Sequence, residues 1–394
     1  MRPRFLGGNT LRLLQNGAEY FPCLTQAIDT AHSALSLETY IFADDETGRE
    51  IAAALVRAAG RGVVVRVLVD GFGSKGLFGG IQQQLLDAKV QVLIYHPKVS
   101  PLTLRRNRLR RLHRKLVVID GRVAFVGGIN IIDDRHMLHM PAVDGIPPPP
   151  RYDYAVRLEG PLVAVAIKEV EGLWGRTAWV NLRWRWRTRL HTALITTVSP
   201  GNQRAALVVR DNLHHRSDIE DAYLEAIEQA QQEVIIGNAY FFPGLRFRRA
   251  LLRAAGRGVR VVLLLQGRPE YLLLHYATRG LYGSFLEAGV EIYEYHKSFM
   301  HAKVAVIDQH WATVGSSNID PFSLMLGREA NVMVEDPGFA GELRASLQRH
   351  LEDGALIVAK SAWPGQPLWR RIVIWCAYGF ARLLIGLVGY GGKY

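Results

Sequence analysis

Cysteine is scarce in this chain, which has only 2 such residues in 394. Cys23 and Cys376 stand far apart, so they offer neither a disulfide framework nor the spacing of a metal site. Such sparse cysteine usage fits a reducing compartment. The sequence also lacks a compelling cluster of metal-ligating residues, so we expect neither a metal nor another cofactor.

A long apolar run is absent from the amino-terminal stretch, MRPRFLGGNTLRLLQNG. We therefore expect neither a signal peptide nor a membrane span there. Near the other end, Ile372–Tyr390 approaches the length of a bilayer-spanning helix. Arg382 near its middle and several glycines favour a segment that lies at a membrane interface. A spanning helix and a helix packed on the protein are the alternatives.

Positive charge is in excess, with 48 lysines and arginines against 36 acidic residues and a formal net charge of +12. This balance favours a polyanionic partner, either nucleic acid or an anionic membrane surface. Basic residues crowd Arg105–Lys115, as a solvated charge run or as a cationic rim that collects phosphates. Trp184 and Trp186 alternate with arginines 183, 185, 187 and 189, which fits a membrane interface, base stacking or an ordinary linker.

One motif occurs twice. Residues 113–130 read HRKLVVIDGRVAFVGGIN, and residues 301–318 read HAKVAVIDQHWATVGSSN. Both copies hold histidine, lysine, aspartate, glycine and asparagine in the same frame. The matched residues are His113 and His301, Lys115 and Lys303, Asp120 and Asp308, Gly127 and Gly315, and Asn130 and Asn318. Polar and small residues that recur in register indicate a functional site rather than core packing.

Each copy has the pattern of a β-hairpin, with β-branched runs on both sides of Asp120 or Asp308. Alternate residues of a strand share a face, so the histidine and the lysine of one copy point the same way. Gly127-Gly128 and Gly315-Ser316 leave the backbone accessible to an anion. An imidazole, an ammonium and an amide together suit a phosphate. Asp120 and Asp308 belong to the motif and count among its candidate catalytic residues, although we expect them to brace the hairpins rather than to contact a substrate.

The duplication extends beyond the motif. The heptapeptide RAAGRGV occurs at Arg57–Val63 and again at Arg253–Val259, and LETYIF (37–42) is echoed by GNAYFF (237–242). This alignment sets Glu38 opposite Asn238 and leaves Glu38 either to line a pocket or to cap a strand end. Expected helices and buried strands alternate in both halves, which is typical of an α/β fold.

We therefore predict two duplicated α/β/α domains with mixed sheets, related by a pseudo-twofold axis and with the active site at their interface. The predicted divisions are a first domain over 1–180, an Arg/Trp-rich linker over 181–204, a second domain over 205–357 and an apolar tail over 358–394. This arrangement would bring the two half-sites together around one phosphodiester.

These paired motifs resemble those of the phospholipase D superfamily. Within it, the LETYIF, Gly127–Asn130 and Gly315–Asn318 segments are similar to those of bacterial cardiolipin synthases of the short form, without amino-terminal membrane helices. The resemblance covers roughly residues 8–355. It implies phosphatidyl transfer between anionic phospholipids through a phosphohistidine. It also implies a peripheral position at the bacterial inner membrane, on its cytoplasmic face, with no obligatory nucleic acid.

The resemblance also assigns roles to residues. One histidine attacks phosphorus and the other donates a proton; His113 is the expected nucleophile and His301 the acid, with the reverse assignment open. The groups that would hold the phosphate oxygens are Lys115, Lys303, Asn130, Asn318 and Ser316. The acids that would orient the histidines are Asp153 and Glu329. Gly128 stands where many superfamily members carry serine, so one hydroxyl contact to phosphate is missing.

Three other functions fit parts of the pattern. A phospholipase D would let water rather than a lipid alcohol capture the intermediate. A metal-independent nuclease would use the positive charge but give the apolar tail no role. A binding module with a decayed site fits least well, because both motifs are intact.

Overall fold

We analysed a computed structural model of the chain, which describes residues 3–96, 110–135, 148–186, 200–211, 215–320, 327–363, 365 and 367–385. The strands of the first half are β1 (Leu6–Gln15), β2 (Ala34–Thr39), β3 (Val64–Asp70), β4 (Gln91–Tyr95), β5 (Arg111–Leu112), β6 (Lys115–Ile119), β7 (Val123–Gly127) and β8 (Tyr154–Glu159). Those of the second half are β9 (Gln203–Arg210), β10 (Glu233–Asn238), β11 (Arg260–Gln266), β12 (Glu291–Tyr295), β13 (Lys303–Ile307), β14 (Trp311–Gly315), β15 (Gly327–Glu335) and β16 (Ala355–Ile357).

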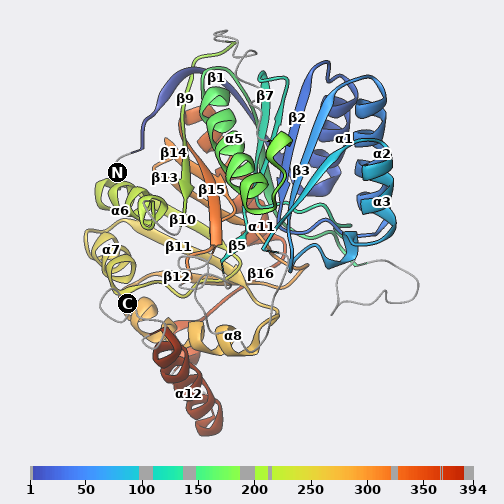
Figure 1. The fold of residues 1–394 in the computed structure, drawn as a ribbon. Helices are drawn as coiled ribbons and strands as arrows, with labels where there is room; N and C mark the ends of the chain where they lie inside the picture. Colours follow the sequence, from blue (N-terminus) through green and yellow to red (C-terminus); the bar gives the residue numbers. More distant parts are fainter. Residues whose placement is uncertain are drawn as a thin grey trace.

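The helices cover these strands and connect them (Figure 1). Those of the first half are α1 (Asn16–Asp29), α2 (Glu46–Gly60), α3 (Gly80–Asp87) and α5 (Leu162–Val180). Those of the second half are α6 (Asp218–Gln229), α7 (Leu245–Gly256), α8 (Leu272–Arg279), α9 (Tyr282–Glu287), α11 (Pro337–Glu352) and α12 (Leu368–Ile385).

The strand order is the same in both halves when each is followed outward from the centre. β1 and β9 pair at the centre, and the order continues β8-β7-β6-β2-β3-β4 on one side and β15-β14-β13-β10-β11-β12 on the other. In each half the last three strands of this order are parallel and the others antiparallel. In addition, β16 pairs antiparallel with β12, and the short β5 pairs parallel with β15. The predicted mixed α/β fold, duplicated about a pseudo-twofold axis, is therefore confirmed.

The RAAGRGV repeat has a physical role in both halves. Arg61, which follows α2, donates hydrogen bonds to the carbonyl oxygens of Ile28 and Ala31 at the end of α1. Arg257 does the same for the end of α6. Carbonyl groups at a helix end have no partner within the helix, so these arginines cap the preceding helix and fix it against its neighbour.

The two halves share one apolar core. It contains residues from β6–β8 of the first half and from β13–β15 of the second, together with the buried faces of α5 and α11. Figure 1 shows α5 and α11 between the halves, while α1, α2 and α3 lie on the outer side of the first half. Separate outer cores lie beneath α1–α3 and beneath α6–α9. The shared core is what holds the two motifs in one place.

The structure corrects the alignment of LETYIF with GNAYFF by one residue. Phe42 forms a bridge with Ile131, and Phe241 forms the equivalent bridge with Ile319. Phe42 therefore matches Phe241, whereas the sequence alignment paired it with Phe242. The side chains of a strand alternate between its faces, so a shift of one residue changes the face assigned to every residue in the segment.

With the corrected register, Glu38 matches Gly237 and not Asn238. Neither role considered for Glu38 is correct, because its carboxylate accepts two hydrogen bonds from the Arg114 guanidinium, at 2.5 and 3.1 Å. Arg114 also contacts Glu169 on α5. Arg114 and Glu38 are both almost fully buried. This charged pair ties the residue between His113 and Lys115 to β2 and α5.

At the carboxyl end, α12 packs on α8 and projects from the body of the protein (Figure 1). The Tyr378 ring lies 5.8 Å from that of Phe242, and Ile374 and Ala381 are buried. Within the described residues, no helix is long and apolar enough to cross a membrane. The predicted segment Ile372–Tyr390 continues beyond α12, and residues 386–394 lie outside the described residues.

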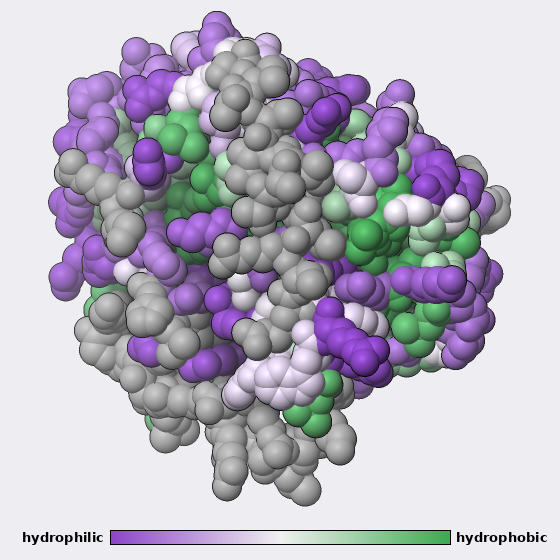
Figure 2. Space-filling view, turned by 45° about the horizontal axis from the view of Figure 1, so that its top comes forward, coloured by the Kyte–Doolittle hydropathy of each residue, from purple (hydrophilic) through white to green (hydrophobic). Residues whose placement is uncertain are grey.

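Two other sequence features fall partly outside the described residues. Residues 97–109 are not described, so of the basic run only Arg110, Arg111, Arg114 and Lys115 are seen. Residues 187–199 are also not described. Trp186 packs on the protein, since its carbonyl accepts a hydrogen bond from Trp174 (2.7 Å) and its ring stacks on that of Trp174. On the face in Figure 2, hydrophobic residues appear in separate areas between hydrophilic ones.

The buried Glu38–Arg114 pair gives the first prediction. Arg114→Met should lower the free energy of unfolding by about 3–5 kcal/mol, because it leaves the Glu38 carboxylate buried without its counter-charge. Adding Glu38→Leu should recover most of this loss, since a buried ion pair can often be replaced by apolar groups. Urea denaturation of both variants measures the difference. A double variant as unstable as Arg114→Met would contradict this reading of the pair.

Candidate active site

The histidine of the first motif is held by the second half of the chain. His113 follows β5, which pairs with β15, and its backbone N–H donates to the carbonyl of Arg328 (3.0 Å). Its ring atom Nδ1 lies 3.0 and 3.1 Å from the two carboxylate oxygens of Glu329. Strand pairing and the ion pair therefore both join His113 to the opposite half.

The histidine of the second motif is held by the first half in the same way. The His301 N–H donates to the carbonyl of Tyr152 (2.7 Å), and Nδ1 lies 2.7 Å from Oδ2 of Asp153. An ionised carboxylate can only accept, so Nδ1 carries the hydrogen in both rings. This leaves Nε2 of each histidine for a substrate, the arrangement that nucleophilic and general acid–base catalysis require.

Asp153 and Glu329 occupy equivalent places despite their different distances from the motifs. The N–H of Gly128 donates to the carbonyl of Tyr154 (2.9 Å), and the N–H of Ser316 donates to that of Ala330 (3.1 Å). Each acid immediately precedes the residue that accepts this bond. The sequence suggested both acids as orienting groups but gave no sign that each serves the histidine of the other half.

The two motif lysines are buried beside the histidines. Lys115 donates to the carbonyl of His113 (2.7 Å), and Lys303 donates to that of His301. Burial lowers the pKa of Lys115 to about 7, and the nearby charge of Lys303 acts in the same direction. Burial also lowers the pKa of Lys303 to about 8, against the effect of Asp153. An anion bound between them would favour the protonated form of both lysines.

Burial and positive charge also disfavour protonation of the histidines. Burial lowers the pKa of His113, with Glu329 acting in the opposite direction. The pKa of His301 falls well below its ordinary value through burial, then through Lys303, Arg151, Lys115 and His113. Contacts join the two half-sites: Ser316 of the second motif donates to Glu329, the partner of His113, and Gly128 of the first motif lies against Asp153, the partner of His301. Both motifs therefore contribute to one site. A bound phosphodiester anion would raise the pKa of both rings.

The three predicted phosphate-binding residues differ in their contacts. The Asn130 side-chain oxygen accepts from the N–H of Ile41 (3.1 Å), and the described part of the chain offers its NH₂ group no hydrogen bond. Asn318 is buried at the matching position. The Ser316 hydroxyl donates to Oε2 of Glu329 (2.5 Å). Ser316 therefore acts on the acid that orients His113.

The motif aspartates, which are also candidate catalytic residues, lie at the opposite ends of β6 and β13 from the histidines. Asp120 accepts hydrogen bonds from the backbone N–H groups of His32, Ser33 and Ala34, which lead into β2. Asp308 accepts from those of residues 231–233, which lead into β10. Both aspartates fix neighbouring strands, which is the bracing role expected of them.

Gly128 has a geometric explanation in Asp153. A Cβ atom at Gly128 would lie 2.3 Å from Oδ1 and 2.6 Å from Oδ2 of Asp153, closer than atoms can approach. Glu329 has one more methylene group, and at the matching place Ser316 forms a hydrogen bond with it instead. Glycine beside aspartate and serine beside glutamate are thus two combinations that fit the same place in the two halves: Gly128–Asp153 in the first and Ser316–Glu329 in the second.

Tyr40 is a site residue that sequence reasoning missed. Its ring centroid lies 4.9 Å from that of His113, and Nζ of Lys115 lies 5.6 Å from the same ring. Tyr40 belongs to the LETYIF segment, which carried part of the resemblance. The available signal was the position of that segment at the end of a buried strand, where ligands of α/β proteins commonly bind.

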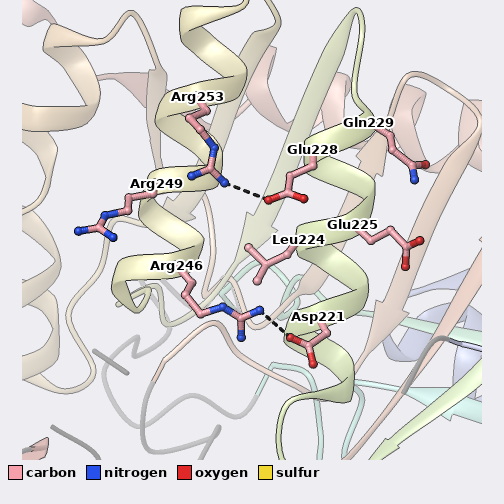
Figure 3. Close-up of a pocket in the computed structure, with 8 residues that line it drawn as sticks. All are labelled: Asp221, Leu224, Glu225, Glu228, Gln229, Arg246, Arg249 and Arg253. Atoms are coloured by element: carbon pink, nitrogen blue, oxygen red, sulfur yellow. Dashed lines mark hydrogen bonds and ion pairs between the residues drawn. The ribbon is translucent and has the colours of Figure 1, made fainter. Parts of the chain in front are cut away.

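A groove lies between α6 and α7, away from the paired motifs (Figure 3). Its volume is about 650 Å³. Arg246 pairs with Asp221 and Arg253 with Glu228 across it, both at 3.0 Å. These exposed ion pairs neutralise the charges of the groove and indicate a helix–helix contact rather than a site. Among the described residues, no group of three or more histidines, cysteines or carboxylates could hold a metal.

Comparison with known proteins agrees with the motifs. The family model described as "Cardiolipin synthase, PLD-like domain" matches residues 24–139 and 223–351. The chain is 42% identical to cardiolipin synthase B of Escherichia coli K12 over 384 residues, 97% of this chain and 90% of that protein. It is 30% identical to the major cardiolipin synthase ClsA of Bacillus subtilis, over 93% of this chain and 74% of that protein.

A solved structure shares the fold. Phosphatidylserine synthase of Haemophilus influenzae aligns with a TM-score of 0.69 at 14% identity, and the alignment covers 98% of this chain and 97% of that one. At this level of identity the likeness concerns the fold alone.

The Gly128–Asp153 pair gives the second prediction. Gly128→Ala and Gly128→Ser should each lower the thermal stability, because the new Cβ displaces the Asp153 carboxylate. Combining Gly128→Ser with Asp153→Glu, which copies the pair of the second half, should restore part of it. We expect a coupling energy of about 1–3 kcal/mol in the double-mutant cycle. Purely additive effects would mean that the two positions are independent.

Proposed function

The chain belongs to the family of cardiolipin synthases with phospholipase D-like domains, and from this premise we propose that it transfers a phosphatidyl group between phospholipids. Two phosphatidylglycerols, or one and another phospholipid, would give cardiolipin and a small alcohol. The observation that carries the proposal is the reciprocal pairing His113–Glu329 and His301–Asp153, which orients two imidazoles within one buried site.

In the first step, Nε2 of one histidine attacks the phosphorus of the donor lipid. The bond between phosphorus and the leaving glycerol oxygen breaks, and the other histidine gives its Nε2 proton to that oxygen. The product is a phosphatidyl group bound to Nε2 of the attacking histidine. The carboxylate on Nδ1 stabilises the positive charge that develops on the attacking ring.

In the second step, a hydroxyl group of the acceptor lipid attacks the same phosphorus. Its proton passes to the histidine that acted as the acid, and the bond between phosphorus and nitrogen breaks. The starting protonation states are restored. Lys115 and Lys303 would stabilise the non-bridging oxygens in both steps, together with the amide groups of Asn130 and Asn318.

We also propose that α12 and the start of α8 dock on an anionic membrane surface, at the cytoplasmic face of the bacterial inner membrane. Large apolar side chains of α12 are exposed: Trp369 is 64% and Trp375 81% accessible. Tyr271 and Leu272 of the α8 region are about equally exposed, at 60% and 62%. The net charge of +12 adds electrostatic attraction to anionic lipids.

The catalytic prediction concerns the two histidines. Purified protein with phosphatidylglycerol vesicles should form cardiolipin, and His113→Ala or His301→Ala should lower the rate by at least about a thousandfold, since each removes a group used in both steps. His310→Ala, an exposed histidine outside the site, is the matched control and should keep the wild-type rate. Mass spectrometry of the lipid products measures the effect. Substantial activity in both site variants would refute the mechanism.

The membrane prediction concerns the exposed tryptophans. Replacing Trp369 and Trp375 together by serine should weaken binding to phosphatidylglycerol vesicles at least about tenfold, because a buried aromatic side chain contributes about 1.5–3 kcal/mol. Leu86→Ser on α3, another exposed apolar position, is the control. Co-sedimentation with vesicles measures the affinity. Unchanged binding by the double variant would show that another surface faces the membrane.

A further inference from the structure

A small cavity lies at the carboxyl ends of β10 and β11, beside α8. Its volume is about 30 Å³. The polar and aromatic residues that line it include Tyr240, Gln266, Arg268, Glu270 and Tyr271. Ligands of open α/β sheets bind outside the carboxyl ends of the strands, so the position is suited to a ligand. This space exceeds the roughly 10–15 Å³ that a cavity needs to hold one water molecule, so it can take a hydroxyl group, and it is too small for an acyl chain.

In the first half, the equivalent strand end is covered by the loop that follows it. Asp70 matches Gln266, since these residues end β3 and β11 and pair with Tyr95 and Tyr295 respectively. The Asp70 carboxylate accepts hydrogen bonds from the backbone N–H groups of residues 72, 73 and 112, at 2.9, 3.1 and 2.9 Å. It thereby holds the following loop against the strand end. Among the described residues, Gln266 has only one contact of this kind, a long hydrogen bond from the N–H of Arg268 to its side-chain oxygen (3.5 Å).

Gln266 has a donor that lacks a partner. Its side chain is 8% exposed, and its amide nitrogen forms no hydrogen bond within the described ranges of the chain. A buried donor without an acceptor is unfavourable, and such groups are usually satisfied by a ligand or a water. Since Gln266 lines the cavity, an acceptor atom placed there would satisfy it.

The cavity belongs to the neighbourhood of the two histidines. Ala239, which lines the cavity, donates its N–H to the carbonyl of Ala302 (2.9 Å), the residue between His301 and Lys303. Glu270 and Tyr271 of the lining also act on Tyr40, whose ring packs on that of His113. A molecule with one end in the cavity would therefore have its other end near the reacting phosphorus.

The chemistry of the lining favours a polyol over a phosphate. Gln266 supplies a donor, Glu270 an acceptor and the tyrosines both, which matches a group with several hydroxyls. The Arg268 guanidinium is engaged with the carbonyl of His296 (2.7 Å). The other side of the site differs, because Lys75 and Arg111 lie over the Phe72 ring, at 4.6 and 5.4 Å. Cations on that side suit the phosphate of a lipid.

We propose that the cavity is the acceptor subsite and binds one hydroxyl group of a glycerol head group, with Gln266 and Glu270 as the specificity-determining residues. This inference rests on the proposed phosphatidyl transfer and deepens it. The subsite forms no covalent bond. It holds one hydroxyl of the acceptor so that another can attack the phosphorus, which favours transfer to a polyol over transfer to water.

The test compares acceptors of different hydroxyl content. Labelled glycerol is offered to the full-length protein with phosphatidylglycerol as donor, and ethanol serves as an acceptor with a single hydroxyl. Gln266→Leu should raise the KM for glycerol about tenfold, the effect of one lost hydrogen bond. The KM for ethanol should change much less. The products should shift from cardiolipin toward phosphatidic acid.

Two further variants complete the test. Glu270→Gln, at an exposed position, should raise the glycerol KM in the same selective way without risk to folding. Gln229→Leu, which makes the same substitution in the groove of Figure 3, should have no effect. Equal effects of Gln266→Leu on glycerol and ethanol, or no effect on glycerol, would overturn the subsite while transfer stands. Failure of the wild-type protein to transfer to any acceptor would instead overturn the proposed function.

Discussion

The structure depends on two ion pairs that cross between the halves of the chain. His113 is oriented by Glu329 of the second half, and His301 by Asp153 of the first. Neither half therefore contains a complete catalytic group, although each contains a complete motif. The shared core around α5 and α11 and the pairing of β5 with β15 maintain these contacts. Separation of the halves would remove the orienting acid from both histidines at once.

The two halves keep the same backbone framework, whereas some side-chain contacts at equivalent positions differ between them. The strand order, the helix-capping arginines and the bracing aspartates occur in both halves. The first half has the Gly128–Asp153 pair where the second has Ser316–Glu329. The two histidines consequently have unequal surroundings, which suits a reaction in which one is the nucleophile and the other the acid. Asymmetry at the carboxyl ends of β3 and β11 would distinguish donor from acceptor in the same way.

The sequence predicted those features that depend on a repeated local pattern. Two motifs in one register were sufficient for the mixed α/β fold, and the β-branched runs around Asp120 and Asp308 correctly predicted two hairpins. Features that depend on contacts between distant parts of the chain were harder to predict. The crossed partnership of Asp153 with His301 depends on how the halves pack, which no local pattern encodes. The register of LETYIF was wrong by one residue, because similar aromatic residues stand at neighbouring positions and the strand pairs that fix it are distant in sequence.

The central claim is that two displacements occur at one phosphorus, each assisted by a different histidine. The stereochemistry of the reaction tests it most directly, with a phosphatidylglycerol made chiral at phosphorus by sulfur substitution. Each in-line displacement inverts the configuration, so transfer through a phosphohistidine should give a product with overall retention. Overall inversion would mean that the acceptor attacks the donor lipid directly, and it would contradict the covalent mechanism.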